Sequence, residues 1–278
     1  MIPYFSYNQI QLGPVTFYPW GFFVGLAFIL AYFLVLKQAL VLKQAKEKNI
    51  GEKKIFWLAI WIFVGAIIGS RLGYILQFTD FYFKNPLEIF KISGGGLMFA
   101  GGLFGALITG WAYLKKAKLN FLKIADIVSP AIAFGIFIGR IGCFLINDHQ
   151  GAITGLPWAI RWSDGLLRHP IALYLSLSGL ILFFILWYLK EGLKKPGQLF
   201  FIFLAGYSLS RFFLDFLRAG DTVLADPRYF NLTVSQWLSL VILIAILVFD
   251  AIMSIWQKYG IVFQLNKLFR RLIQVRRV

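Results

Sequence analysis

Three arginines lie within long apolar runs of this sequence: Arg71, Arg140 and Arg211. A guanidinium in an apolar run is costly to bury and marks a functional candidate by default. Each lies about 14–16 residues from the lysine-rich end of its run, or roughly 21–24 Å along a helix that crosses a ~30 Å apolar core. This equal depth favours one shared anion-binding site, and three independent snorkelling or ion-paired arginines are the alternative.

The run around Arg211, SRFFLDFLRAGD, adds an acid and a second base. Arg211, Asp215 and Arg218 are spaced i, i+4 and i+7, so a helix presents them on one face. Such a stripe neutralises part of its own charge and leaves guanidinium donors free, and guanidinium forks bind phosphate oxygens bidentately. The pattern favours a phosphate site. For Asp215 the alternative is an ion pair that only stabilises the helix.

A polar segment follows Arg140 in GRIGCFLINDHQG. Asn147, Asp148 and His149 stand where a helix would leave the bilayer, and Gly151 follows them. These residues form either a substrate-binding lip or a solvated helix exit. His149 has no second ligand nearby, which favours a polar surface residue over a catalytic base.

Two further patterns predict local structure. The run GGGLMFAGGLFG contains Gly101 and Gly102. Small residues let helices approach closely or let a ligand reach the backbone, and helix packing is the commoner reason.

In NLTVSQW, Thr233 is the expected N-cap of the last helix, with Gln236 in its first turn.

The composition indicates that this chain is embedded in a lipid bilayer. Of its 278 residues, 59% are hydrophobic and only 14% are charged, against about a quarter charged in soluble domains. The net charge of +16 lies in short blocks between apolar runs, which argues against nucleic acid as a partner. One cysteine, Cys143, excludes an intrachain disulfide, and two histidines make a metal site unexpected. We expect no cofactor.

Seven apolar segments are each long enough to cross a bilayer as a helix. Most of the 28 lysines and arginines lie in alternate connections and the C-terminal tail. The positive-inside rule then predicts an N-terminus outside and a C-terminus in the cytoplasm. We expect an all-α integral membrane protein with seven transmembrane helices, one domain over 1–278, no cleaved signal peptide, and a basic tail, 258–278, on cytoplasmic headgroups. The spans run roughly over 17–42, 55–77, 96–114, 124–146, 170–189, 197–217 and 234–256.

Seven short motifs follow one another along the chain: LGPVTFYPWG, GSRLGYIL, GGGLMFAGGLFG, ADIVSPAIAFGIFIGRIGCF, RHPIALY, GYSLSRFFLDFLR and LTVSQWLS. In this order they resemble the prolipoprotein diacylglyceryl transferase family over essentially the whole chain. The GR-x-G block, preceded by an Asp-x-x-x-Pro element that begins at Asp126, is specific to that family pattern.

The resemblance implies an activity. Members of the family move a diacylglyceryl group from phosphatidylglycerol to the sulfhydryl of the lipobox cysteine in a prolipoprotein signal peptide; glycerol phosphate leaves and a thioether forms. The resemblance also implies a bacterial cytoplasmic membrane, with other membrane lipids around the protein and a site in the outer half, in agreement with the depth of the arginines. Arg140 matches the family's phosphatidylglycerol-binding arginine, and Arg211 matches its essential arginine on the sixth span.

The sequence departs from the family pattern at several positions. The histidine of F-H-G-G is Ala100 here, and the tyrosine of W-Y-G is Trp20. Cys143 replaces the asparagine that follows GR-x-G, and Asp148 replaces the glutamate five positions later. In the motif HP-x-Q-L-Y-E, Ala172 replaces the glutamine and Leu175 replaces the glutamate. A mechanism that assigns proton abstraction to the family histidine therefore does not fit this chain.

Arginine electrostatics can replace that histidine. A positive field lowers a thiol pKa from about 8.5 and stabilises the leaving phosphate. We expect Arg140 and Arg211 to hold the phosphate, with Asp148 or His149 as the proton acceptor at the mouth. A lipid-binding homologue without activity and an anion transporter are the alternatives. The expected substrate-binding set is Arg71, Arg140, Arg211, Arg218, Asn147 and Gly151, with Asp126, Asp215, Gly101 and Gly102 in structural support.

Overall fold

The computed structural model describes residues 2–44, 50–91, 96–148, 150–193, 195–222 and 225–249, and at residues 12, 15, 41–44 and 99 it describes the backbone alone. The expectations for His149 and for the basic tail, 258–278, lie outside this described part.

Long helices make up most of the described chain. They are α1 (Pro19–Gln44), α2 (Glu52–Gln77), α4 (Phe99–Lys116), α5 (Phe121–Leu145), α6 (Ile171–Leu189), α7 (Gln198–Leu214) and the helix Val234–Phe249. The short elements are α3 (Thr79–Lys84) and the 3-10 helices η1 (Pro86–Phe90) and η2 (Asp215–Leu217). In the part of the chain that the structure describes, three antiparallel hairpins pair β1 (Ile10–Leu12) with β2 (Val15–Phe17), β3 (Ile160–Arg161) with β4 (Leu167–Arg168), and β5 (Arg228–Tyr229) with β6 (Leu232–Thr233).

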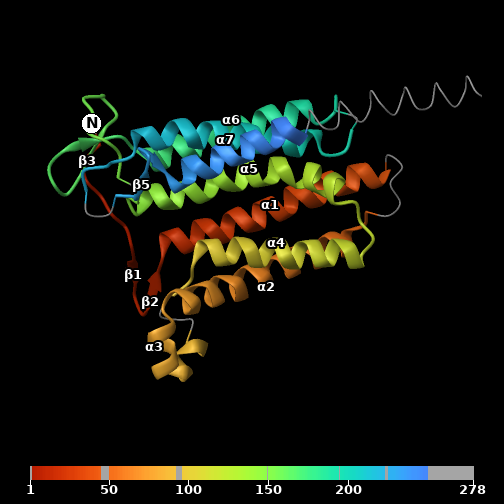
Figure 1. Ribbon diagram of the computed structural model, residues 1–278, viewed down its shortest axis with the longest axis horizontal. Coiled ribbons are helices and arrows are strands. Elements are labelled where there is room, and N and C mark those ends of the chain that lie inside the picture. Colours follow the sequence, from red (N-terminus) through yellow and green to blue (C-terminus); the bar gives the residue numbers. More distant parts are fainter. Residues whose placement is uncertain are drawn as a thin grey trace, which may run out of the picture.

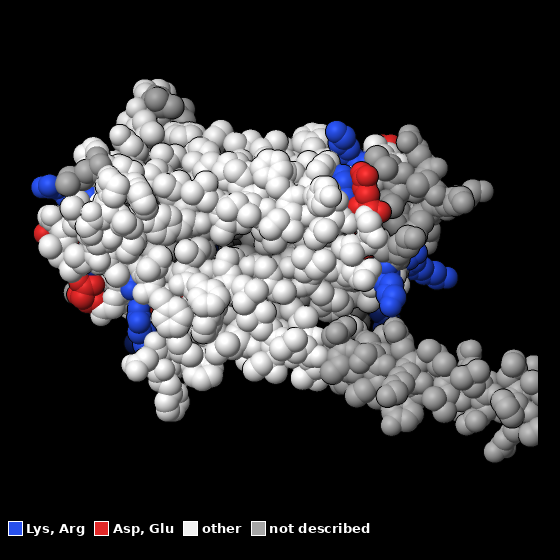
Figure 2. All heavy atoms as spheres, turned by 90° about the horizontal axis from the view of Figure 1, so that it is seen from above, with Lys and Arg blue, Asp and Glu red and all other residues white. Residues whose placement is uncertain are grey.

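Within the described residues, five helices are long and apolar enough to cross a membrane: Pro19–Leu40 within α1, then α2, α5, α6 and Gln198–Leu217, which joins α7 to η2. Large apolar side chains such as Phe33, Trp61 and Ile181 are exposed on them. On the face seen in Figure 2, charged side chains gather at the two ends, and a broad uncharged band separates them. So large an exposed apolar surface needs lipid around it. The expectation of an all-helical integral membrane protein is therefore confirmed.

The long helices run along the longest axis of the molecule (Figure 1). α1 lies between the pair α2–α4 and the group α5–α6–α7 and packs against both α2 and α5. The N-terminus, the hairpins and α3 lie at one end, which we call the hairpin end. The turns α4–α5 and α6–α7 lie at the other, which we call the basic end because these turns carry Lys118 and Lys195.

Glycines bring α2 and α4 into backbone contact. A Cβ atom on Gly69 would lie 2.3 Å from the carbonyl oxygen of Gly101, and one on Gly105 would lie 2.1 Å from the carbonyl oxygen of Gly65. No side chain fits into gaps of this size. The glycines of α4 therefore serve close packing of two helices.

A carboxylate from α5 caps the start of α7. Asp126 accepts hydrogen bonds from the backbone N–H of Gly197 at 2.6 Å and of Phe200 at 2.8 Å. The first turn of a helix leaves N–H groups without helical partners, and its dipole favours a negative charge there. Asp126 thereby sets where α7 begins beside α5, and with it the position of Arg211 along the helix axis.

The helix Val234–Phe249 begins with a reciprocal cap. The N–H of Thr233 donates to Oε1 of Gln236 at 2.9 Å, and the N–H of Gln236 donates to Oγ1 of Thr233 at 3.2 Å. This arrangement is a capping box, and it confirms Thr233 as the N-cap.

The helix contact through Gly105 leads to a stability prediction. We expect Gly105→Ala to lower the free energy of unfolding by about 1–3 kcal/mol, because the new Cβ meets a backbone carbonyl that cannot move alone. Gly25→Ala in α1, where nothing lies within 4 Å of the added Cβ, is the matched control. Thermal unfolding in detergent measures both variants. Equal unfolding midpoints would contradict this explanation.

Candidate active site

A buried carboxylate organises the arginines at the end of α7. Asp215 is fully buried, and its Oδ1 lies 3.4 Å from Nε of Arg211 and 3.8 Å from Nη1 of Arg218. Both arginine side chains are only 11% exposed. The i, i+4 spacing of Arg211 and Asp215 thus produces an ion pair, while Arg218 reaches the carboxylate from extended backbone after η2 and not from a helix face. A buried carboxylate without such partners would strongly destabilise the protein, so these charges depend on one another.

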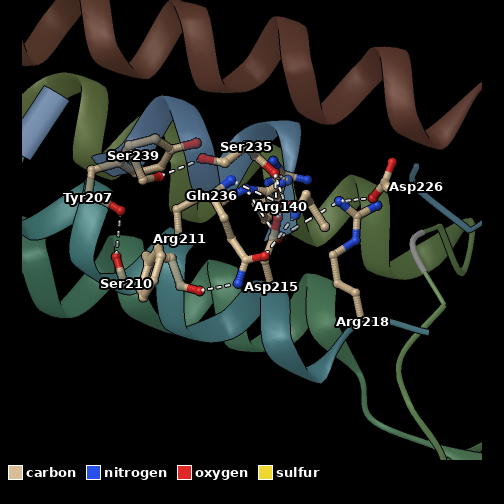
Figure 3. A network of polar contacts seen from close by, with 12 residues as sticks. Arg140, Tyr207, Ser210, Arg211, Asp215, Arg218, Asp226, Ser235, Gln236 and Ser239 are labelled. Atoms are coloured by element: carbon tan, nitrogen blue, oxygen red, sulfur yellow. Dashed lines mark hydrogen bonds and ion pairs between the residues drawn. The ribbon is translucent and has the colours of Figure 1, made fainter. Parts of the chain in front are cut away.

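The start of the last helix supplies the other partners of Asp215. Its Oδ2 accepts hydrogen bonds from Oγ1 of Thr233 at 2.7 Å and from Oγ of Ser235. Oγ of Ser235 also accepts a hydrogen bond from Nη2 of Arg211 at 3.4 Å. Figure 3 shows that the network joins residues of α7 and of the last helix around the carboxylate. Asp215 therefore fixes both the arginines and the packing of two helices.

Arg140 on α5 brings a third guanidinium to this cluster (Figure 3). It is close enough for its charge to act on Arg211. Its Nη1 donates a weak hydrogen bond of 3.9 Å to Sγ of Cys143, and Nη1 of Arg211 is buried without a hydrogen-bond partner among the described residues. Two neighbouring guanidinium groups repel each other. Their free donors fit the oxygens of an anion such as phosphate.

A cavity of ≈ 270 Å³ adjoins the cluster at the hairpin end. Arg218 lines it and forms an ion pair there with Asp226. Asn147 lines it as well, with a left-handed backbone at φ 52° and a buried Nδ2 that lacks a hydrogen-bond partner among the described residues. The other lining residues are Asp148, Gln150, Trp162, Ala219, Thr222 and Ala225. The polar segment after α5 therefore faces a cavity with donors available to a ligand.

Gly151 lies at a junction of backbone segments. A Cβ atom there would lie 2.2 Å from the carbonyl oxygen of His169, and the Gly151 carbonyl accepts a hydrogen bond from Nη1 of Arg168 at 3.2 Å. Gly151 also forms a β-bridge with Arg218. Its small size is needed for these contacts, which hold Arg218 beside the cavity.

Arg71 has different surroundings from the other two arginines of the spans. It is buried, and its guanidinium donates to the carbonyl oxygens of Ile89 at 2.9 Å, Gly96 at 3.1 Å and Lys91 at 3.0 Å. It also lies over the ring of Tyr82, 5.3 Å from the centroid. These contacts hold the connection between α2 and α4. The expected phosphate contact of Arg71 gains no support from them, because its donors are already bonded to the backbone.

Arg168 is a central residue that the sequence pattern did not identify. It is 2% exposed, and its guanidinium binds Asp221 through two hydrogen bonds of 3.0 and 2.9 Å and Asp164 through two of 3.1 and 2.9 Å. These bonds join the β3–β4 loop to the segment after η2. Hydrogen bonds from Arg168 lower the pKa of Asp221 below its usual value. No charge pattern along the chain signals a pairing across 53 residues.

Two departures from the family pattern lie in a packed environment. Ala172 and Leu175 of α6 are 3% and 1% exposed. Ser176 beside them donates to the carbonyl oxygen of Phe137 on α5 at 2.8 Å. Apolar side chains suit these buried positions, so the altered motif does not disturb the contact between α5 and α6.

The hydrogen bonds of Arg168 to Asp164, Asp221 and Gly151, which we call the Arg168 clamp, lead to a second stability prediction. We expect Arg168→Lys to lower the free energy of unfolding by about 1–3 kcal/mol, because the three N–H donors of an ammonium cannot replace the five hydrogen bonds of the guanidinium. Arg228→Lys on β5, where the exposed side chain makes one hydrogen bond of 3.1 Å, is the matched control. Denaturant unfolding in detergent compares the two. An Arg168→Lys effect no larger than the control would contradict the clamp.

The same clamp has a predictable pH dependence. The pKa values of Asp164 and Asp221 are both lowered by folding, Asp164 chiefly through the N–H of Leu166 and Asp221 chiefly through Arg168. Groups with a lowered folded pKa stabilise the fold above their unfolded value of 3.8 and lose that effect as the pH falls through the folded value. The difference between wild type and Arg168→Lys should therefore shrink in acid.

This chain is similar in sequence to known proteins over most of its length. The family model described as prolipoprotein diacylglyceryl transferase matches residues 8–252. A relative from Finegoldia magna is 39% identical over 81% of this chain and 87% of its own, and one from Bordetella parapertussis is 32% identical over 85% and 90%. Both relatives are named phosphatidylglycerol–prolipoprotein diacylglyceryl transferase. This chain therefore belongs to the prolipoprotein diacylglyceryl transferase family.

Proposed function

We propose that this protein transfers the diacylglyceryl group of phosphatidylglycerol to the sulfhydryl of the lipobox cysteine of prolipoproteins. The observation that carries the proposal is the pair Arg140 and Arg211. The two guanidinium groups come from different helices, and Nη1 of Arg211 is buried with no hydrogen-bond partner among the described residues. Family membership supplies the reaction, and the names of the relatives supply both substrates.

The reaction is a displacement at a saturated carbon. The cysteine sulfur of the prolipoprotein attacks the glycerol carbon of the diacylglyceryl group that bears the phosphate. A carbon–sulfur bond forms, the carbon–oxygen bond breaks, and glycerol phosphate leaves with the electron pair. The thiol proton goes to an acceptor. The two requirements are a thiolate and stabilisation of the negative charge that grows on the phosphate.

The arginine cluster meets both requirements. Arg140 and Arg211 hold the phosphate and stabilise the charge that develops as it leaves. The same positive field favours the thiolate over the thiol. Asp215 orients Arg211 and Arg218 through its ion pairs, so the donors are in place before the substrate arrives. Asp215 is fully buried and acts here as a positioning residue.

The cavity beside Arg218 receives the polar part of the substrates. Asn147, with its unpaired buried Nδ2, binds an oxygen of the glycerol phosphate headgroup. Asp148 is exposed at the same cavity and is our proposed proton acceptor. His149, outside the described residues, is the alternative acceptor.

We propose that all seven long helices cross the bacterial cytoplasmic membrane, with the hairpin end outside and the basic end in the cytoplasm. α4 is shorter than the five long apolar helices, and so is the described part of the last helix, Val234–Phe249. The two occupy the third and seventh positions in the alternating order. The lysines of the turns at the basic end support this orientation. The site then lies in the outer half of the bilayer, where the lipobox cysteine of an exported prolipoprotein arrives.

The phosphate contact gives a direct test. We expect Arg140→Ala to lower the transfer rate about 10²–10³-fold, because it removes a donor to the leaving phosphate. Arg140→Lys should restore only part of the rate, since an ammonium does not replace a bidentate fork. The measurement is the diacylglyceryl adduct on a lipobox peptide incubated with phosphatidylglycerol, followed by mass spectrometry.

Arg161→Ala is the control for this series, because Arg161 is an exposed arginine at the same end of the molecule. It should keep the wild-type rate. Wild-type activity in Arg140→Ala would exclude the phosphate contact.

The orientation is tested by reporter fusions. A reporter that is active only in the cytoplasm should be active after Val278 and silent within the β3–β4 loop, residues 162–165, because the basic end faces inward. The opposite pattern would reverse the orientation and move the site to the inner half of the membrane.

A further inference from the structure

A second cavity, of ≈ 570 Å³, lies at the basic end, away from the arginine cluster. The ends of α1 and α6, the start of α5 and the turn before α7 enclose it. Its basic lining residues are Lys37, Lys123, Lys190 and Lys195. The proposed transfer reaction uses none of these four lysines.

The charges of this cavity are unbalanced. Of its two carboxylates, Asp126 is engaged by the N–H groups of Gly197 and Phe200 at the start of α7, and Glu191 is exposed at the rim. Burial lowers the pKa of Lys190; the negative charge of Glu191 opposes this shift, and the positive charge of Lys37 adds to it. A bound anion would relieve the repulsion between the lysines.

The rest of the lining is apolar, and it suits a lipid better than a free anion. Trp187 lies in the wall, and the ammonium of Lys190 sits over its ring at 3.1 Å from the centroid. Tryptophan and lysine together are typical of the membrane–water interface. The remaining apolar lining residues are Ile50, Ile127, Leu193, Pro196 and Leu199.

The wall of the cavity is also held by a buried contact. Gln38 is 9% exposed, lines the cavity, and donates from Nε2 to the carbonyl oxygen of Ile127 on α5 at 3.1 Å. This bond joins α1 to α5 beside Lys37 and Lys123, which line the same cavity. A ligand bound here would contact three long helices and the turn before α7 at once.

We propose that this cavity binds the phosphate-bearing headgroup of an anionic phospholipid from the leaflet at the basic end. The lysines bind the phosphate, and the wall around Trp187 contacts the glycerol and the first acyl carbons. The lipid bridges α1, α5 and α6 and stabilises the protein without entering the transfer reaction. Naming that leaflet as the cytoplasmic one rests on the orientation proposed above.

The test must distinguish lipid binding at this cavity from substrate binding at the arginine cluster of the hairpin end. Full-length protein carrying Arg140→Ala, which disables the proposed substrate contact, is purified in detergent and titrated with phosphatidic acid while its thermal unfolding midpoint is followed. In this background we expect Lys37→Gln/Lys190→Gln to weaken the apparent lipid affinity about thirtyfold, because two charges near an anionic headgroup are lost. Phosphatidylcholine should not raise the midpoint of either protein.

The matched control is Lys115→Gln/Lys116→Gln at the end of α4, which removes the same charge outside the cavity. It should keep the full lipid response, and Lys37→Arg/Lys190→Arg should restore most of it. If Lys37→Gln/Lys190→Gln fails to fold, Lys37→Gln/Lys195→Gln takes its place in the titration, because it changes only exposed side chains of the lining. It should weaken the apparent lipid affinity as well.

Two results would overturn the proposal. An unchanged lipid response in the lysine variants would remove the site, and inorganic phosphate acting as strongly as phosphatidic acid would indicate a free-anion site instead. The transfer rate of Lys37→Gln/Lys190→Gln with native Arg140 is measured separately and should equal that of wild type. A loss of that rate would show that this cavity is not independent of the reaction.

Discussion

The rest of the site depends on the burial of one charge, the carboxylate of Asp215. A carboxylate removed from water requires positive partners and hydrogen-bond donors. Arg211 and Arg218 supply the charge, while Thr233 and Ser235 supply the hydroxyl groups. Because Thr233 also caps the last helix, a single buried acid determines how α7, η2 and that helix meet.

This arrangement leaves an excess of positive charge in an apolar protein. Asp215 balances one of the two arginines that flank it, Asp226 is paired with Arg218, and Arg140 adds a further guanidinium from α5. An anion that shares this charge would stabilise the cluster, and guanidinium groups suit phosphate oxygens. The packing elsewhere is consistent with a preformed site. Asp126 fixes the start of α7, and Arg168 joins the β3–β4 loop to the segment after η2.

Much of the fold follows from local features that a sequence displays. The apolar runs predict helices, and the observed bounds of α1, α2, α4, α5, α6 and α7 lie within a few residues of the expected ones. The expected end of the last span, residue 256, lies outside the described residues. The length of an apolar run is a local feature because the thickness of the bilayer sets it. The pairing of Arg211 with Asp215 was predictable as well, since an i, i+4 spacing places the two side chains on one helix face. Arg218 follows η2 with extended backbone and still reaches Asp215.

Contacts between distant segments were not predictable in this way. Arg71 has the expected position in its helix, yet its guanidinium binds carbonyl groups of the connection that follows α2. No spacing marks the hydroxyl of Ser235 on Asp215 or the carboxylate of Asp221 on Arg168. Asp164 stands four residues before Arg168, but the pair lies in the β3–β4 hairpin and not on a helix face. Such partners are set by how loops fold over the helix ends, and equal depth in a membrane does not determine them.

The central claim is that arginine electrostatics sustain the reaction although Ala100 replaces the family histidine. A general base commonly contributes about 10²–10⁴-fold, so its absence slows the reaction without ending it. The most direct measurement incubates the wild-type protein with phosphatidylglycerol and a lipobox peptide from its own organism, and quantifies two products by mass spectrometry. The account predicts a diacylglyceryl thioether on the cysteine and an equal amount of released glycerol phosphate. Folded protein that binds phosphatidylglycerol but forms neither product would contradict it and would identify a lipid-binding homologue without activity.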